Sequence, residues 1–182
     1  MDDGRHLVLI GMMGVGKTSV GRRLALRLGR QLLDTDKMVE DEAGCTVAEI
    51  FAAEGEAAFR TLEAAAVRKA LDSPDYAVIA FGGGAVLDPI TRGLARQLAL
   101  VVWLQAPARE LARRVSASMR RSGGTARPLL AGGGSPEAIL EELSRQREEA
   151  YRAAAHLRVD TTGKSTFQVA TAVLAATGWE AP

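Results

Sequence analysis

The sequence predicts an α/β fold of three layers, with helices on both faces of a central five-stranded parallel sheet. Short apolar segments alternate with amphipathic segments of helical period along the whole chain. Several of the apolar segments have almost no polar residue, which is typical of parallel strands covered on both faces. The strands are expected at residues 7–10, 31–33, 76–81, 100–104 and 157–159.

The expected helices begin and end at recognisable residues. Gly29 is placed to end the first helix, and Thr46 followed by Glu49 has the spacing of a capping box. Ser135 followed by Pro136 is typical of a helix start. Because neither an internal repeat nor a linker is visible, we expect one domain over residues 1–182.

Composition limits the classes of function. A net charge of +1 gives no general reason to expect a nucleic-acid or membrane partner. The single cysteine, Cys45, allows no internal disulfide and suits a reducing compartment. The first expected strand starts too early to leave room for a signal peptide, and no apolar run is long enough to cross a bilayer. We therefore expect a cytoplasmic protein, and a monomer.

The most specific motif is GMMGVGKT at residues 11–18, between an apolar strand and a helix. In this P-loop pattern, backbone N–H groups and the helix N-terminus surround phosphates. Lys17 reaches the outer phosphates, and the Thr18 hydroxyl is placed to ligate Mg²⁺. An empty glycine-rich turn is the alternative, but the spacing and both flanks favour a nucleoside triphosphate site.

Polar residues and glycines follow two further strands, at the edge where α/β sheets bind ligands. One carboxylate of the pair Asp34 and Asp36 could hold Mg²⁺ through water, and the other could accept a proton or hydrogen bonds from a hydroxyl. Helix capping alone is the alternative. The glycines at 82–84 would let a ligand touch bare backbone, unless they form only a tight turn.

A lid is expected over residues 116–134, where arginines and glycines are concentrated. Six arginines and one acid lie between Arg109 and Leu130. A solvated basic loop or a nucleic-acid contact are the alternatives. A lid is favoured because a phosphate site already exists, and closure would exclude water and bring arginine to the transferred group.

Taken together, these segments resemble shikimate kinase, of the nucleoside-monophosphate-kinase-like P-loop group. The matching segments, in order, are GMMGVGKTSVGRRLA (11–25), LLDTD (32–36), IFAAEGEAAFRTLE (50–63), FGGGAV (81–86), RPLL (127–130), REEAYR (147–152) and VDTTGKS (159–165). The last resembles the segment near the adenine. The resemblance covers nearly the whole chain.

The resemblance implies transfer of the ATP γ-phosphoryl group to the 3-hydroxyl of shikimate, in aromatic amino-acid biosynthesis. The implied substrate-binding subregion is about 34–63. Lys17, Asp36 and Arg127 would be catalytic, and Mg²⁺ would be held by Thr18 and, through water, by Asp34. The implied ATP-binding residues are Gly14, Val15, Gly16, Lys17, Thr18, Ser19, Arg113 and Arg127, with Arg113 chosen by the register of Leu111-Ala112-Arg113. The implied shikimate-binding residues are Asp36, Arg60, Gly82, Gly83, Gly84 and Arg147.

Other functions fit the residues less well. A kinase for another small hydroxy acid, such as gluconate, could use the same nucleotide site. A GTPase is disfavoured because the Asn-Lys-x-Asp guanine motif is missing from the sequence. A non-catalytic ATP-binding scaffold would be expected to lack a motif residue, and none is missing.

Gly163-Lys164-Ser165 is not a second P-loop because Arg158 stands where its first glycine should be. His6 and His156 are expected to be structural or on the surface.

Overall fold

The computed structural model describes residues 4–121 and 134–179. The strands are β1 (His6–Ile10), β2 (Leu32–Asp34), β3 (Val78–Ala80), β4 (Ala99–Gln105) and β5 (Leu157–Asp160). The helices are α1 (Lys17–Leu28), α2 (Thr35–Ala43), α3 (Val47–Leu71), α4 (Pro89–Leu98), α5 (Ala108–Arg121), α6 (Pro136–Ala154) and α7 (Thr166–Thr177), with a short 3₁₀ turn, η1 (Ala85–Leu87). All five expected strands are present.

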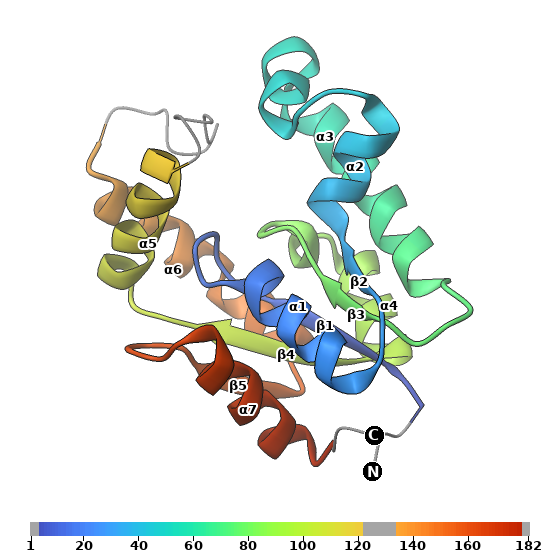
Figure 1. Ribbon diagram of the computed structural model, residues 1–182. Coiled ribbons are helices and arrows are strands. Elements are labelled where there is room, and N and C mark those ends of the chain that lie inside the picture. Colours follow the sequence, from blue (N-terminus) through green and yellow to red (C-terminus); the bar gives the residue numbers. More distant parts are fainter. Residues whose placement is uncertain (1–3, 122–133, 180–182) are drawn as a thin grey trace.

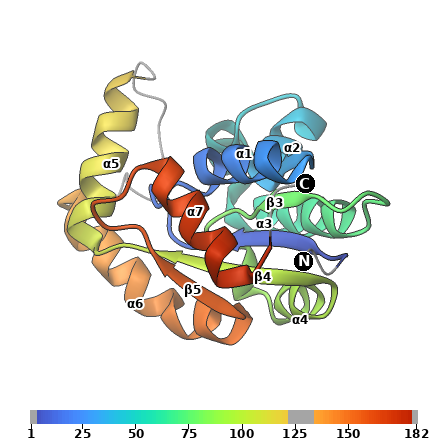
Figure 2. The same ribbon diagram turned by 60° about the horizontal axis from the view of Figure 1, so that its bottom comes forward.

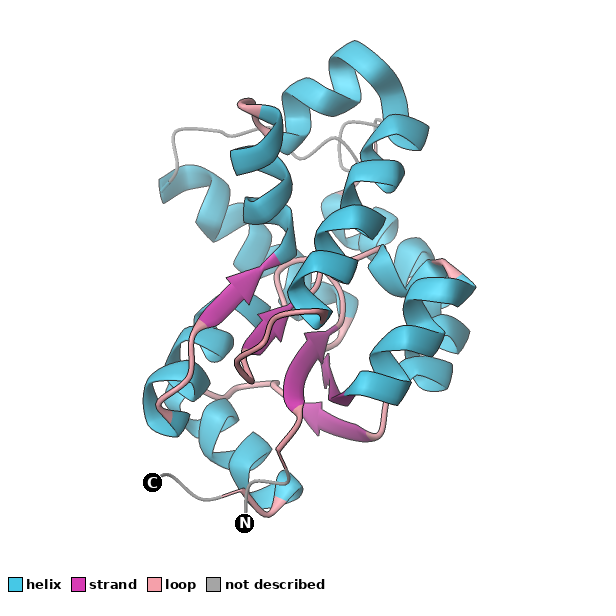
Figure 3. Ribbon diagram, turned by 90° about the vertical axis from the view of Figure 1, so that its right-hand side faces the viewer, coloured by secondary structure: helices cyan, strands magenta, loops and turns pink. Residues whose placement is uncertain are grey.

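The strands form one parallel sheet in the order β2-β3-β1-β4-β5. Figure 2 shows α1 and α7 on one face of this sheet and α4 and α6 on the other. Figure 3 shows the strands in the interior, surrounded by helices. The prediction of a three-layer α/β/α fold with a five-stranded parallel sheet is confirmed.

Two strands differ in length from the expected ones, because strand pairing does not begin and end with the apolar run. The expected strand at 76–81 shortens to Val78–Ala80, since Tyr76 is 53% exposed and lies outside the ladder. Strand β4 is longer than expected because Ala99 pairs with His6, and Gln105 with Asp160. Hydrogen-bonding partners, which the apolar pattern does not show, decide these ends.

The expected helix boundaries are confirmed. Gly29 ends α1 in the left-handed conformation, with φ of 63°. Thr46 and Glu49 form the expected capping box at the start of α3. The Ser135 hydroxyl accepts from the Ala138 N–H at 3.1 Å, directly before Pro136 begins α6.

The main core lies between the sheet and its helices and includes residues of β1, β3 and β4 with no exposed surface, such as Val8, Ile79 and Val102. A second, smaller cluster of Val39, Ile50, Phe59 and Ala66 fixes α2 against α3. The two helices therefore form a separately packed unit above the carboxyl edge of the sheet, across from α5 in Figure 1.

Register brings three loops to one edge of the sheet. Asp34 is the partner of Ala80, and Ala80 is the partner of Leu9. The residues that follow these positions are the glycine-rich turn after β1, the start of α2, and the glycines at 82–84. Since β1 lies where the strand order reverses, this edge is the expected place for a ligand.

Within those two described stretches, no helix is both long enough and apolar enough to cross a membrane.

Candidate active site

The P-loop connects β1 to α1 and carries Lys17 into the site. Gly14 and Gly16 have φ of 79° and 100°, a conformation that strains any residue with a Cβ. Gly16 caps α1 without a side chain, so no side chain covers the amino end of the helix. The Lys17 Nζ donates to the carbonyl oxygens of Gly11 at 2.8 Å and Met12 at 3.2 Å, which holds the ammonium group over the loop.

A cavity of about 510 Å³ opens around this loop. Its walls come from four parts of the chain: the P-loop and first turn of α1 at residues 13–20, the strand-end residues Asp34, Asp36, Phe81 and Gly83, the α5 residues Arg114, Val115 and Ser118, and Lys164, Thr166 and Val169 around the start of α7. The volume falls in the range of small-molecule sites. The cavity therefore runs from the phosphate loop to the Asp36 carboxylate.

Thr18 and Asp34 meet at the edge of this cavity. The Thr18 hydroxyl donates to Asp34 Oδ2 at 2.5 Å. The other carboxylate oxygen, Oδ1, caps α2 by accepting from the N–H groups of Asp36 at 3.2 Å and Lys37 at 3.4 Å. Asp34 therefore caps a helix and also presents an oxygen to the P-loop, so the two interpretations of this residue are compatible.

These two oxygens suit Mg²⁺. No cluster of three or more His, Cys, Asp or Glu side chains that could cage a metal occurs among residues 4–121 and 134–179. Mg²⁺ usually keeps several waters and is bound by one or two protein oxygens together with substrate phosphates. An adjoining hydroxyl and carboxylate beside a phosphate loop match that mode.

The Asp36 and Glu63 carboxylates both lie against Gly82. A Cβ built on Gly82 would collide with Glu63 Oε1 and would lie 2.6 Å from Asp36 Oδ1. Asp36 opens into the cavity, yet surrounding protein partly desolvates its carboxylate and raises its pKa, with the Lys17 charge opposing the shift. Burial likewise raises the pKa of Glu63, which is 3% exposed, against the opposing charge of Arg60. Glycine at 82 is thus required by space.

Arg60 is held on α3 by two acids. Its guanidinium donates to Glu63 Oε2 at 2.6 Å and to Glu56 Oε1 at 2.7 Å. A Cβ on Gly84 would collide with the same guanidinium. Arg60 therefore points from its helix to the glycine loop, with a fixed orientation and 26% of its side chain exposed.

Arg147 reaches the same loop from α6. It is 4% exposed, and its guanidinium donates to the Gly83 carbonyl at 3.1 Å. Tyr151, one turn later, donates to the same carbonyl at 2.5 Å. Among the described residues no carboxylate oxygen lies within 4.0 Å of the Arg147 guanidinium. The Arg147 charge acts on the Glu63 carboxyl and opposes the rise in its pKa that burial causes, but without direct contact the buried guanidinium is still free to pair with an anionic ligand.

Comparisons with known proteins identify the family. The sequence pattern of the family described as shikimate kinase matches residues 13–177. The chain belongs to the shikimate kinase family. A shikimate kinase of Symbiobacterium thermophilum is 46% identical over 93% of this chain and 94% of its own. A solved shikimate kinase of Acinetobacter baumannii, in complex with shikimate, is 35% identical with a TM-score of 0.86, covering 95% of this chain and 92% of that one.

The gluconate alternative has weaker support. A solved gluconokinase of Sinorhizobium meliloti is 19% identical, with a TM-score of 0.56 over 94% of this chain and 90% of its own. At that identity the likeness shows a shared fold only. The prediction of a shikimate kinase, and with it of an ATP-dependent small-molecule kinase, is confirmed at the level of the family.

In this family member the structure brings most of the expected site residues together. The expected residues that line the P-loop cavity are Gly14, Val15, Gly16, Lys17, Thr18, Ser19, Asp34, Asp36 and Gly83. Around the adjoining glycine loop lie Arg60, Gly82, Gly84 and Arg147. Arg127, and residues 122–133 of the expected lid, lie outside the described part of the chain, so their roles stay predictions from the sequence.

Arg113 is the exception. Its side chain is 69% exposed, pairs with Glu110 at 2.8 Å and does not line the cavity. The next residue, Arg114, lines it instead and is held by Thr161, whose hydroxyl and carbonyl accept at 2.9 and 2.8 Å. One residue on a helix is a turn of about 100°. The structure thus places Arg114, and not Arg113, at this cavity.

Two residues of this site were not assigned a role from the sequence. Glu63 orients Arg60, and among the described residues its Oε1 is the one buried side-chain oxygen or nitrogen without a hydrogen-bond partner. The i,i+3 spacing of Arg60 and Glu63 was the available signal. Lys164 lines the cavity and donates to the Asp160 carbonyl at 2.9 Å. Its segment was linked to adenine by resemblance, but no single residue was named.

Proposed function

We propose that this protein transfers the γ-phosphoryl group of ATP to the 3-hydroxyl of shikimate, giving shikimate 3-phosphate and ADP. Membership of the family supports the reaction. The choice of acceptor rests on Arg147, which is 4% exposed and has no carboxylate oxygen within 4.0 Å among the described residues. Its guanidinium lies at the same bare glycine loop as Arg60. A planar carboxylate on a polyhydroxylated ring would complete that arrangement.

On the donor side, the P-loop amides and Lys17 would hold the phosphates of ATP. Gly14, Val15 and Gly16 supply the loop, and Ser19 completes the first turn of α1. Thr18, with Asp34 through water, would hold Mg²⁺, which neutralises charge on the phosphates when bound. Arg114, the α5 arginine that lines the cavity, would contact the nucleoside in place of Arg113.

On the acceptor side, Arg60 and Arg147 would bind the carboxylate from two helices. Gly82, Gly83 and Gly84 would lie against the ring, since a side chain at 82 or 84 would fill the space already taken by Asp36, Glu63 and Arg60. Asp36 would bind the hydroxyl that reacts. The fixed guanidiniums therefore set the distance between the carboxylate and the reacting oxygen.

Asp36 would also accept the proton. Partial desolvation raises the pKa of this carboxyl, which makes the carboxylate a stronger base than an exposed aspartate. As the acceptor oxygen bonds to the γ-phosphorus, the hydroxyl proton passes to Asp36 and the bond from phosphorus to the ADP oxygen breaks. Lys17 stabilises negative charge on the moving group, and Arg127 is predicted from the sequence to do the same.

A coupled assay of ADP formation tests this function. We expect ATP consumption that requires shikimate and is at least about a hundredfold slower with gluconate, because gluconate does not present a carboxylate fixed on a ring. Equal rates with the two acceptors would contradict the proposal, and so would ATP hydrolysis that shikimate does not stimulate.

The remaining expectations concern the setting. We infer one catalytic domain over residues 1–182, acting as a monomer in the cytoplasm, with ATP and shikimate as ligands and neither nucleic acid nor membrane as a partner. The single cysteine and the near-neutral net charge support this inference. Light scattering after size exclusion checks the monomer, which a mass of 19.3 kDa would indicate.

A further inference from the structure

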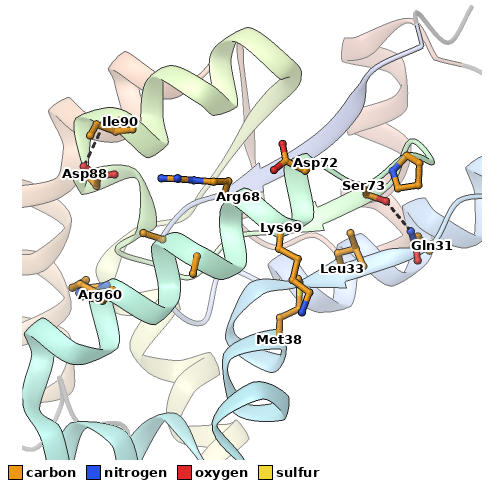
Figure 4. Close-up of a pocket in the computed structure, with 14 residues that line it drawn as sticks. Gln31, Leu33, Met38, Arg60, Arg68, Lys69, Asp72, Ser73, Asp88 and Ile90 are labelled. Carbon is orange, nitrogen blue, oxygen red and sulfur yellow. Dashed lines mark hydrogen bonds between the residues drawn. The ribbon is translucent and has the colours of Figure 1, made fainter.

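Two cavities lie along α3, outside the nucleotide cavity. A groove of about 1160 Å³ runs between α3, the strand β2 and the start of α4 (Figure 4). A second cavity of about 240 Å³ lies between α3 and the glycine loop. Both are lined by Arg60, Ala64 and Asp88. Since Ala64 has only a methyl group as side chain, cavities that both reach it are neighbours.

The smaller cavity suits an apolar ring. Ala64, Ala85 and Leu87 supply apolar wall. Three charged residues also line it: Arg60 pairs with Glu63 Oε2, while Glu63 Oε1 lies against Gly82, and the Asp88 carboxylate caps α4 by accepting from the Thr91 N–H at 2.8 Å. A cavity of about 150 Å³ is large enough to hold benzene, so this one accommodates a six-membered ring.

The groove beside it offers a cation. Within the described part of the chain, the Arg68 guanidinium makes neither a hydrogen bond nor an ion pair; its backbone carbonyl accepts from the Asp72 N–H. Figure 4 shows its guanidinium extended across the groove towards Asp88 and Ile90. Lys69 points the other way, towards Met38, and lies 3.5 Å from Glu42.

Apolar side chains are exposed around the same place. Leu87, in the smaller cavity, is 39% exposed, and Ile90, in the groove, is 67% exposed. Exposed apolar groups that adjoin a hollow are a mark of a binding surface. The site thus has an apolar wall on one side and an unpaired guanidinium on the other. A small molecule with an apolar ring at one end and a carboxylate at the other would fit it.

We propose that these adjoining cavities form a second ligand site, for an aromatic carboxylate, with the ring in the smaller cavity and the carboxylate on Arg68. Arg60 connects it to the acceptor site, because its guanidinium also lies against Gly84. A ring packed on Arg60 would hold the guanidinium on Glu56 and Glu63 and so weaken acceptor binding. That coupling rests on the proposed function, whereas the binding itself does not.

Calorimetry on the full chain without nucleotide or shikimate tests the binding, with 3-phenylpropionate as the probe. We expect the neutral 3-phenylpropanamide to bind about tenfold more weakly, and Arg68→Gln to weaken binding of the acid by about the same factor, because each removes the charge-assisted pair. Lys69→Gln is the matched control, on the next residue of the same helix, and should change the affinity less than about twofold. Basal turnover of both variants should equal that of the wild type.

Three results would overturn the site: no binding at about 10 mM probe, equal affinity for acid and amide, or equal losses in the Arg68 and Lys69 variants. Ala64→Leu, which fills the smaller cavity, should abolish binding in a chain with unchanged circular dichroism; retained binding places the ring elsewhere.

In turnover assays the probe should raise the KM for shikimate and leave the KM for ATP unchanged. An unchanged KM for shikimate would refute the coupling, and a chain that binds the probe but does not phosphorylate shikimate refutes the proposed function alone.

Discussion

The donor and acceptor halves of the site are built in different ways. The donor half is a continuous turn, residues 11–18, whose glycines and lysine are fixed by local backbone geometry. The acceptor half combines α2, α3, the glycine loop and α6, over residues from 36 to 147. One half is therefore local in sequence, and the other exists only once the chain is folded.

This difference separates what each half controls. The P-loop offers backbone N–H groups and one lysine, which suit any triphosphate. The acceptor half offers two guanidiniums held at chosen positions by Glu63, Glu56 and Gly83. We expect changes in the donor half to lower kcat, and changes in the acceptor half to raise the KM for shikimate.

Lys17→Met should have the largest effect. If Lys17 stabilises charge on the transferring group as proposed, kcat should fall by about a thousandfold or more, with the melting temperature nearly unchanged. Steady-state kinetics and thermal denaturation measure the two. Near-normal turnover in a folded variant would disprove the role of this lysine, and Arg22→Met, on the outer face of α1, serves as the charge-removing control.

Arg147→Met should act on the other half. Loss of a buried charged hydrogen-bond donor to the carboxylate should raise the KM for shikimate by about a hundredfold and leave the KM for ATP within about twofold. The same change removes a buried cation that has no carboxylate oxygen within 4.0 Å among the described residues, while Tyr151 still donates to the Gly83 carbonyl, so stability should change little. A lower melting temperature with an unchanged KM would mean that Arg147 is structural.

Features that are local in sequence could be predicted from it, and features that depend on contacts between distant residues could not. The P-loop, the helix caps and the five strands depend on local spacing and were predictable. Arg113 was chosen where Arg114 lines the cavity, because the register of a helix is not fixed by a motif that contains two adjacent arginines. The role of Glu63 and the separate packing of α2 on α3 depend on contacts between distant residues, which a single sequence does not show.

Gly82→Ala should give a smaller loss than Arg147→Met. Its Cβ would meet the Glu63 and Asp36 carboxylates, so both must shift and the KM for shikimate should rise by about tenfold. Gly93→Ala is the control, since a Cβ at that α4 position meets nothing within 4 Å and should stabilise the helix by about 0.5–1 kcal/mol. A Gly82 variant with wild-type KM would show that the carboxylates do not need their present positions.

The two histidines should give the smallest effect, and one that spares both halves. His6 Nδ1 accepts from the Ala77 N–H at 3.1 Å, and His156 Nδ1 accepts from the Val101 N–H at 3.0 Å. Both lie at or beside the amino ends of strands, away from the P-loop. Burial lowers the pKa of each imidazole, and neighbouring arginines lower it further: Arg30 for His6, and Arg96 and Arg5 for His156.

Lowered histidine pKa values mean that the unfolded chain binds more protons below about pH 6.5 than the folded one does. Their contribution to stability is therefore complete above that pH and is lost as the pH falls, by about 1 kcal/mol at most for buried His6 and by less for His156, which is exposed to solvent. Glu63 and Asp36, whose pKa values are raised, act in the opposite direction, so the comparison must be between variants.

In urea denaturation at pH 7.5 and 5.5, His156→Asn, whose Oδ1 can accept the same N–H without titrating, should lose less stability on acidification than the wild type. An identical loss in the two proteins would mean that His156 keeps its proton-free state at no cost, and an altered KM for shikimate would show that the amino edge of the sheet also positions the acceptor half.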